Sequence, residues 1–340
     1  MNERERIIAA LELRKPDRVP VFPQVGDHAG IIAGLTYDIM YKDAKRASNA
    51  HLQALERYGY DVVAIQVEPS WPVAEACGAQ VTYPPDKYPW ITRNVINEKK
   101  DLKRVGVPDF MATRSSAVMI EGTRLLAEQT KVPVAAFMTG PLTFSLQLMP
   151  YNDLMVAMVK DRPFVHNLVK KSVAIIKAYG QQLRDAGASI FVICEHDVQM
   201  MMPRDLGEFV VDYLPELLTI FPHNLLHMCG KVMPHIEANA VSLAALGEKG
   251  LNMINVDSLV DLAQLKALFL GKVGVAGNVD HVQLLPHATP KAVDDACRVA
   301  IEAGKEGGGY MLAPGCEITS DTPPENVIAM VKAAAKYGKY

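Results

Sequence analysis

Two potential metal ligands stand two residues apart at the end of an apolar run. The stretch Asn224-Leu225-Leu226 leads directly into His227-Met228-Cys229. In a β-strand, residues i and i+2 point to the same face, so His227 and Cys229 would project side by side. A third soft ligand, Cys316, closes the apolar run that begins at Gly309. One histidine and two cysteines form a zinc-binding set, and three protein ligands leave a fourth position open for chemistry.

The His-x-Cys pair also has a purely structural interpretation, because buried histidines and cysteines are common in protein cores. The metal interpretation requires a fold that brings Cys316 beside His227 and Cys229, although it lies far downstream in the chain. The predicted elements therefore decide between the two.

The composition is that of a soluble globular protein. The 340 residues are about half hydrophobic and carry a net charge of −3, without a block of Lys or Arg, so neither nucleic acid nor an anionic membrane is an expected partner. We find no apolar signal core and no run long enough to span a membrane. The five cysteines are odd in number and widely scattered, which is typical of free thiols or metal ligands in a reducing compartment. We expect a cytoplasmic protein.

Eight short apolar segments alternate with helical patterns. The strand-like segments are 19–25, 62–67, 133–139, 189–194, 224–227, 251–256, 273–277 and 310–313. The helical patterns cover 2–14, 43–58, 115–129, 151–160, 163–186, 205–220, 232–246, 259–269, 290–306 and 324–337. Such alternation predicts an α/β fold with a parallel sheet, and eight units predict a (β/α)8 TIM barrel.

We interpret residues 1–340 as a single barrel domain with an N-terminal helix. The proline-rich stretch 69–110, which holds both tryptophans, would form a rim or lid. A doubly wound sheet is the alternative, but no Gly-x-Gly-x-x-Gly follows any predicted strand.

The barrel interpretation gathers the polar residues at one place. Active sites of this fold lie where the strand carboxyl ends meet the following loops. The fifth and eighth strands face each other across the mouth, so His227, Cys229 and Cys316 can converge, which favours the metal interpretation. The other side chains expected there are Gln24, Asp27, His28, Glu68, Glu195, His196, Asp197, Asp257, Asn278 and Asp280.

Motifs along nearly the whole chain resemble a known family. They are Pro16-Asp17-Arg18-Val19-Pro20-Val21, Thr139-Gly140-Pro141-Leu142-Thr143, Ala186-Gly187-Ala188, His227-Met228-Cys229-Gly230, Gly277-Asn278-Val279-Asp280 and Ala313-Pro314-Gly315-Cys316. The chain resembles the uroporphyrinogen decarboxylase superfamily of barrels, and within it the zinc-dependent, corrinoid-linked methyltransferases. The His-x-Cys…Cys set is similar to the zinc motif of the methylcobalamin:coenzyme M methyltransferase branch.

This resemblance implies that zinc activates a thiol such as coenzyme M for methyl transfer with a methyl-cobalt corrinoid. A corrinoid protein would dock over the barrel mouth and a small molecule would be the other substrate; a homodimer is an oligomeric state to be tested. One alternative is a demethylase component that passes a methyl group from an ether or amine to the reduced corrinoid. A second is a decarboxylase-like lyase, although residues 22–30 lack the arginines that decarboxylases carry there. A third is a non-catalytic partner of a corrinoid protein, with a structural zinc.

Other residues near the predicted mouth have alternative interpretations. Glu195 is a fourth ligand, a partner of His227 or a proton acceptor, or else a solvated loop carboxylate. His196 and Asp197 are alternative ligands in the same turn. Asp27 and His28 contact substrate or form a surface polar pair.

Two residues are candidates for contact with the corrinoid. Met201, with its methionine neighbours at 200 and 202, forms a soft apolar wall or a packed loop. Asn278 is expected at the mouth after the seventh strand. Among the remaining cysteines, Cys194 is predicted to be a core thiol, and Cys77 and Cys297 to be structural.

Overall fold

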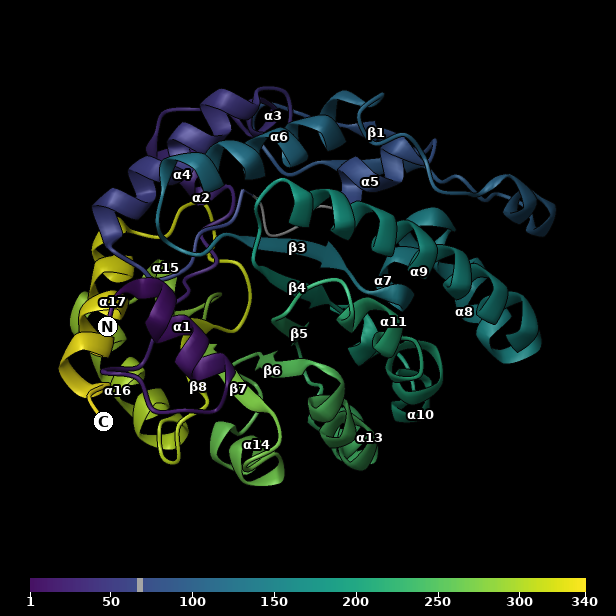
Figure 1. The fold of residues 1–340 in the computed structure, drawn as a ribbon. Helices are drawn as coiled ribbons and strands as arrows, with labels where there is room; N and C mark the ends of the chain where they lie inside the picture. The colour runs from purple at the N-terminus through teal and green to yellow at the C-terminus, as the bar shows by residue number, and fades with distance from the viewer. Residues whose placement is uncertain (66–69) are drawn as a thin grey trace.

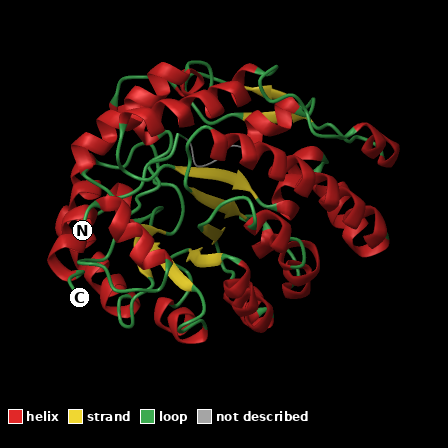
Figure 2. Cartoon of the chain, in the orientation of Figure 1, coloured by secondary structure: helices red, strands yellow, loops and turns green. Residues whose placement is uncertain are grey.

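Six parallel strands form the central sheet of the computed structural model, which describes residues 1–65 and 70–340. Each strand pairs with the next one along the chain, and helices cover the outer side of the sheet (Figures 1 and 2). All six lie within the apolar segments predicted, to within a few residues. They are β3 (Ala135–Thr139), β4 (Ile190–Cys194), β5 (Asn224–Met228), β6 (Leu251–Val256), β7 (Gly274–Val279) and β8 (Tyr310–Pro314).

The first predicted strand, 19–25, and the described part of the second, residues 62–65, do not form regular strands. They make isolated parallel bridges, Val21 with Leu312 of β8 and Val63 with Val134 just before β3. Pro20 and Pro23 explain this in the first segment, because proline has no N–H to donate to a ladder. The second predicted strand runs into residues 66–69, which lie outside the described residues, as does the predicted mouth residue Glu68.

Hydrogen bonds nevertheless connect β8 to β3 through these two segments. The Phe22 N–H donates to Leu312 O, the Asp61 N–H to Val21 O, and the Ala135 N–H of β3 to Val63 O, all within 3.0 Å. The α/β, TIM-barrel-like fold is therefore confirmed, with six regular strands and two extended segments.

The outer helices mostly match the predicted ranges. They are α4 (Ala44–Tyr58), α6 (Arg114–Gln129), α8 (Tyr151–Lys160), α9 (Arg162–Asp185), α14 (Leu262–Leu268), α16 (Pro290–Gly304) and α17 (Pro324–Tyr337). Two predicted helices are broken. The range 205–220 divides into α10 (Pro203–Leu206), a π-helical turn η3 (Gly207–Val211) and α11 (Leu214–Leu218), and the range 232–246 into α12 (Met233–Ala238), α13 (Ala240–Ala245) and η4 (Leu246–Lys249).

Short helices follow the ends of several strands and were not predicted. They are α2 (His28–Ile32), α3 (Tyr37–Met40), α7 (Pro141–Leu148), η2 (Val198–Met200) and α15 (Leu284–His287). All but α7 are too short to show a periodic apolar pattern in the sequence. α7 is longer but is buried along almost its whole length, so it also lacks alternating polar and apolar faces.

The interior of the barrel is a separate apolar cluster that the N-terminal helix α1 (Glu3–Leu11) covers at one end. Ile7 and Leu11 of α1 are buried together with inward-facing side chains of the strands, among them Phe137, Val192 and Met253. Because α1 contributes to this cluster, the opposite end, where the strands finish, is left for the site.

The proline-rich excursion contains α5 (Ser70–Ala76), an antiparallel pair of short strands, β1 (Gln80–Thr82) and β2 (Trp90–Arg93), and the 3-10 turn η1 (Lys99–Arg104). Trp71 packs in a row of aromatic rings with Tyr41 and Tyr88, whereas Trp90 is exposed beneath Lys87. A lid function of this segment and the single-domain organisation stay predictions. Among the described helices, none is long and apolar enough to cross a membrane.

Candidate metal centre

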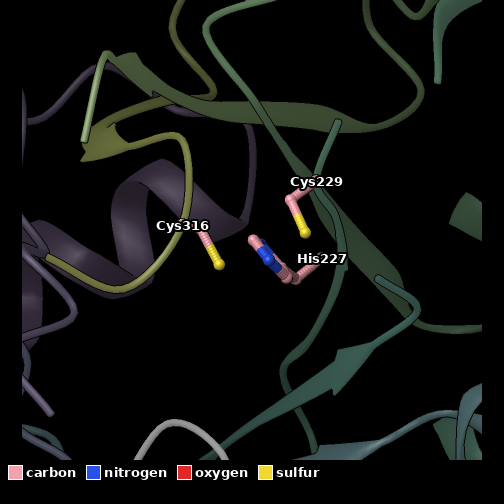
Figure 3. A group of neighbouring side chains, drawn as sticks. All are labelled: His227, Cys229 and Cys316. Carbon is pink, nitrogen blue, oxygen red and sulfur yellow. The ribbon is translucent and has the colours of Figure 1, made fainter. Parts of the chain in front are cut away.

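His227, Cys229 and Cys316 point toward one another at the mouth (Figure 3). Each offers one ligand atom, and the three atoms lie within 4.8 Å of one another. Two sulfur ligands of a tetrahedral zinc, each about 2.3 Å from the metal, would be roughly 3.8 Å apart. The donor types and their spacing therefore fit zinc with one position left open, and the role of the three residues as ligands stays a prediction.

Two glycines allow the chain to place the cysteines. His227 lies in β5, and Cys229 follows the end of that strand. Gly230 then turns the chain with φ +83°, and a Cβ there would lie 2.0 Å from Gln199 Oε1. Gly315, just before Cys316, passes so close to the loop after β6 that a Cβ would lie 2.9 Å from the Ser258 nitrogen. Larger residues would move both thiols.

The imidazole of His227 is held by a neighbouring strand. Its Nδ1 lies 2.6 Å from Oδ1 of Asn255 on β6, and that oxygen also accepts a 3.0 Å hydrogen bond from Gln24 Nε2. All three side chains are buried. Burial lowers the pKa of His227, but the charge of the Cys316 thiolate and hydrogen bonds to Cys316 and Asn255 raise it overall. Sequence reasoning missed Asn255; the signal was one polar residue near the end of an apolar strand.

The two thiols of the cluster are coupled. A hydrogen bond from Cys229, together with the nearby His227, holds the pKa of Cys316 well below its ordinary value despite burial. The same hydrogen bond and burial raise the pKa of Cys229. One of the two sulfurs is thus stabilised as a thiolate, the form that binds metals.

A small cavity of about 40 Å³ opens beside the cluster. It has room for a water-sized group. Among the described residues, its lining includes one acidic side chain, Glu317, and neither lysine nor arginine. The lining residues are Gln24, Phe137, Cys194, His196, His227, Cys316 and Glu317.

The structure places His196 at this cavity but gives Glu195 a different position. His196 Nε2 lies 3.4 Å from Asp197 Oδ2, so the two predicted alternative ligands face each other. Glu195 is fully buried, and its carboxylate oxygens accept the N–H groups of Leu142 and Thr143, each at 2.9 Å, in the first turn of α7.

The solvated-loop interpretation of Glu195 is therefore wrong. Burial raises the pKa of Glu195 to about 7, although the two N–H donors favour the charged form. Its carboxylate lies outside the three-residue cluster that the described chain forms, and a catalytic role stays a prediction.

Asp27 and His28 are both buried, so the interpretation as a surface polar pair is wrong. Burial lowers the pKa of His28 to about 4, and its ring contacts Tyr58 Oη at 2.8 Å. Asp27 donates its N–H to Glu317 Oε1 at 2.9 Å and accepts a hydrogen bond from Tyr41. Asp27 thus adjoins the residue that follows Cys316. Glu317 was missed in the sequence, where the signal was a carboxylate next to a predicted ligand.

The two predicted cofactor contacts are not among the described residues that line the cavity. Asn278 donates through Nδ2 to the carbonyl oxygen of Asp257 at 3.0 Å and so holds the loop after β6. Met201 is partly buried against the core, while Met200 and Met202 are exposed. Contact of Asn278 or Met201 with a corrinoid stays a prediction.

The remaining cysteines lie in structural contexts. Cys194 faces the barrel interior, as predicted for a core thiol, and also lines the cavity. Cys297 is buried within α16, and Cys77 is partly buried after α5.

Comparison with known sequences decides the family. The sequence profile described as uroporphyrinogen decarboxylase (URO-D) matches residues 2–337. The chain belongs to the uroporphyrinogen decarboxylase family. One relative is the methylcobamide:CoM methyltransferase MtaA of Methanosarcina barkeri, which is 27% identical over 98% of this chain and 97% of the relative. Another is the uroporphyrinogen decarboxylase of Legionella pneumophila, 23% identical over 93% and 88%.

A solved structure of this fold is also similar. It is described as a methyltransferase from Methanosarcina mazei, and it superposes with a TM-score of 0.87 over 99% of both chains, at 22% identity. The predicted membership in the uroporphyrinogen decarboxylase family, with its resemblance to the methyltransferase branch, is confirmed. So is the prediction of an enzyme of the methyltransferase class, at the level of the family.

Proposed function

We propose that this enzyme moves a methyl group between a corrinoid and a small thiol, with zinc held by His227, Cys229 and Cys316. The observation that carries the proposal is the convergence of one imidazole and two thiols at the barrel mouth, in a chain related to a methylcobamide:CoM methyltransferase.

The chemistry divides between the metal and the chain. Zinc held by His227, Cys229 and Cys316 would supply a Lewis acid that favours the deprotonated form of a substrate thiol. The chain orients the ligands, and Phe137 and Cys194 line part of the cavity with buried apolar surface. In the transfer the acceptor sulfur bonds to the methyl carbon, and the electron pair of the broken carbon–cobalt bond stays on cobalt.

The rim of the mouth supports a corrinoid protein as the partner. Large apolar side chains are exposed in loops that follow β4, β6 and β7, all at the same end of the parallel sheet. They are Met200, Met202, Leu259 and Val282. A partner that carries the corrinoid would approach the candidate site from this end of the sheet and could cover these side chains.

The charge of the cavity favours a second candidate, in which the small molecule carries no negative charge. Glu317 lines the cavity, and the seven lining residues in the described part of the chain include no lysine or arginine. An anionic sulfonate such as that of coenzyme M would meet a carboxylate there. A neutral or cationic thiol, or a methyl ether or amine donor in the demethylating direction, avoids this repulsion. The same charge opposes decarboxylation of a porphyrinogen that carries several carboxylates.

The test combines metal analysis with a transfer assay. Purified protein should contain roughly one zinc per chain and should consume methylcobalamin in the presence of a thiol. A series with 2-mercaptoethanesulfonate, 2-mercaptoethanol and cysteamine, which are negative, neutral and positive, resolves the charge preference. Zinc without transfer to any thiol would favour the demethylating direction, and protein without zinc affinity would refute the proposal.

Matched variants locate the metal. C229S and C316S should each lose zinc and transfer activity while the far-ultraviolet circular dichroism stays unchanged. C297S is the control, because Cys297 is equally a thiol but is buried in α16. A C316S protein that is active without zinc would contradict the mechanism.

A further inference from the structure

We propose that Asn255 is a positioning residue that fixes the tautomer and orientation of His227, so that the imidazole presents Nε2 to the metal. The inference rests on the proposed function, because it assumes that His227 is a zinc ligand. Its starting observation is the 2.6 Å contact between His227 Nδ1 and Asn255 Oδ1, with both side chains buried. Because Nδ1 is occupied by this contact with Asn255, Nε2 is the ring nitrogen that remains for the metal.

The surroundings of Asn255 permit only one orientation of its amide. Its Nδ2 faces two main-chain oxygens, Ala276 O at 3.2 Å and Pro314 O at 3.5 Å. A rotated amide would place its oxygen against those two acceptors and its NH₂ against the Gln24 NH₂ group. Oδ1 must therefore be the atom that faces His227.

An acceptor at this place determines where the imidazole carries its proton. An amide oxygen cannot donate, so Nδ1 of His227 must be protonated to make the hydrogen bond. In a neutral imidazole the proton on Nδ1 leaves a lone pair on Nε2, which is the form that a metal requires. The other tautomer would direct an N–H at the metal and leave two acceptors facing each other in a buried space.

The fold holds the two residues in register. His227 of β5 is directly paired with Asn255 of β6, which in turn is paired with Ala276 of β7. Gln24 donates to the same Oδ1 from an unusual backbone position, with φ +52°. A non-glycine residue adopts that conformation only when its surroundings enforce it. Asn255 Oδ1 is thus contacted by both Gln24 and His227, and the three side chains come from the first extended segment, β6 and β5.

An amide also suits the charge of this site better than a carboxylate. Two thiolates already balance the charge of a divalent zinc ion. A neutral acceptor orients the histidine without a further negative charge, which would weaken the Lewis acidity of the metal and repel an incoming thiolate.

The test compares two substitutions at position 255 with one elsewhere. N255L removes the acceptor and should lower zinc affinity by about 10- to 100-fold. N255D has the same shape and, with its carboxyl protonated, keeps a carbonyl acceptor for Nδ1–H and an O–H donor in place of Nδ2 for Ala276 O, so it should retain the affinity within a few-fold. N326L is the matched control, because Asn326 is also a buried asparagine whose Nδ2 donates to two carbonyl oxygens, Leu285 O and Ala288 O. It should reduce stability and leave zinc affinity unchanged.

Zinc affinity is measured by competition with a chromophoric chelator, and the thiolate-to-metal absorption of the cobalt-substituted protein reports the ligand geometry. Long-range ¹⁵N correlation spectra of His227 in the zinc-free protein, recorded at a pH where the imidazole is neutral, give the tautomer, which should carry the proton on Nδ1 in the wild type and lose that preference in N255L. These readouts do not depend on methyl transfer.

The outcomes separate this inference from the proposed function. A wild-type protein without zinc affinity refutes the proposed function. A wild type that binds zinc, with N255L equal to it, refutes only the role of Asn255. Loss of affinity in N326L to the same extent as in N255L would also refute it, since general loosening would then explain the effect. Should N255L not fold, N255D alone decides: a loss of affinity beyond a few-fold counts against the inference.

Discussion

The carboxylate of Glu195 accepts two backbone N–H groups at the start of α7, and none of its surface is exposed. The N-terminus of a helix favours a negative charge, whereas burial disfavours it. Burial prevails, because the pKa of Glu195 rises from 4.5 to about 7. The folded protein therefore binds this proton more tightly than the unfolded chain does.

Because the pKa of Glu195 is raised in the folded protein, we predict that its ionisation lowers the free energy of unfolding as the pH increases. Its contribution is fully present below pH 4.5 and is lost as the pH rises to about 7, a change of roughly 3 kcal/mol at most. E195Q cannot ionise, so the difference in unfolding free energy between wild type and E195Q should shift in favour of the variant from pH 5 to pH 8. Urea denaturation at several pH values measures it.

The exposed Glu302 on α16 provides the control, since E302Q should follow the wild type at each pH. If E195Q instead abolishes methyl transfer and leaves the pH dependence of stability unchanged, Glu195 acts in the reaction and not in the fold.

The residues of the cluster differ in how far the sequence could reveal them. His227, Cys229 and Cys316 were recognisable because their types are uncommon together and the strand period places the first two on one face. Asn255 was not, because an asparagine in an apolar strand can satisfy its amide in many ways. Its contact with His227 depends on the register between β5 and β6, which neither strand encodes alone.

Among the elements, the two extended segments before β3 are held in place more by side-chain hydrogen bonds than by regular backbone pairing with the sheet. Asp61 is fully buried and receives hydrogen bonds from the guanidinium groups of Arg6 and Arg18 and from the Val21 N–H, each within 3.0 Å. This network joins α1, the first extended segment and the second. It replaces part of the regular pairing that Pro20 and Pro23 prevent.

We predict that D61N lowers the free energy of unfolding by about 3 kcal/mol, because Arg18 loses this buried carboxylate as its partner while Arg6 keeps Asp17. Chemical denaturation followed by circular dichroism gives the value. D295N, which removes one partner of the exposed Lys291–Asp295 pair on α16, should change stability little. An equally small effect of D61N would show that the isolated β-bridges and backbone hydrogen bonds alone hold these segments.

The length and burial of each element explain which of them could be predicted from the sequence. Strands buried on both faces read as short apolar runs, and six of the eight such runs became regular strands. The helix predicted over 205–220 contains Gly207 and Pro215, and the chain there becomes three short turns. The pair β1–β2 was not foreseen, because a few partly exposed residues among prolines give no period.

For the whole molecule, the cluster joins parts of the chain that are distant in sequence. His227 and Cys229 come from the end of β5, and Cys316 follows β8. A ligand that binds only the folded state stabilises it, by about 2.7 kcal/mol when its concentration is a hundredfold above the dissociation constant. Zinc should therefore stabilise the entire barrel and not only its mouth.

We predict that removing zinc with a chelator lowers the thermal midpoint of unfolding, and that adding zinc restores it. Scanning calorimetry with and without metal measures the shift. C316S should unfold at the same temperature in both conditions, whereas C297S should respond as the wild type does. A wild-type midpoint that ignores the metal would contradict the assignment of the cluster as a zinc site.

The first and last residues of the chain lie against one short stretch of backbone. The amino group of Met1 is 3.4 Å from Oδ2 of Asp17, and Gly338 O accepts the Val19 N–H. Arg18 also forms an isolated bridge with Lys339. A short peptide could join the two ends, and the chain could be opened instead at the exposed turn around Gly271, far from the cysteines. We therefore expect a circular permutant of this barrel to fold, with Cys316 ahead of His227 in the sequence and the same three side chains together in space.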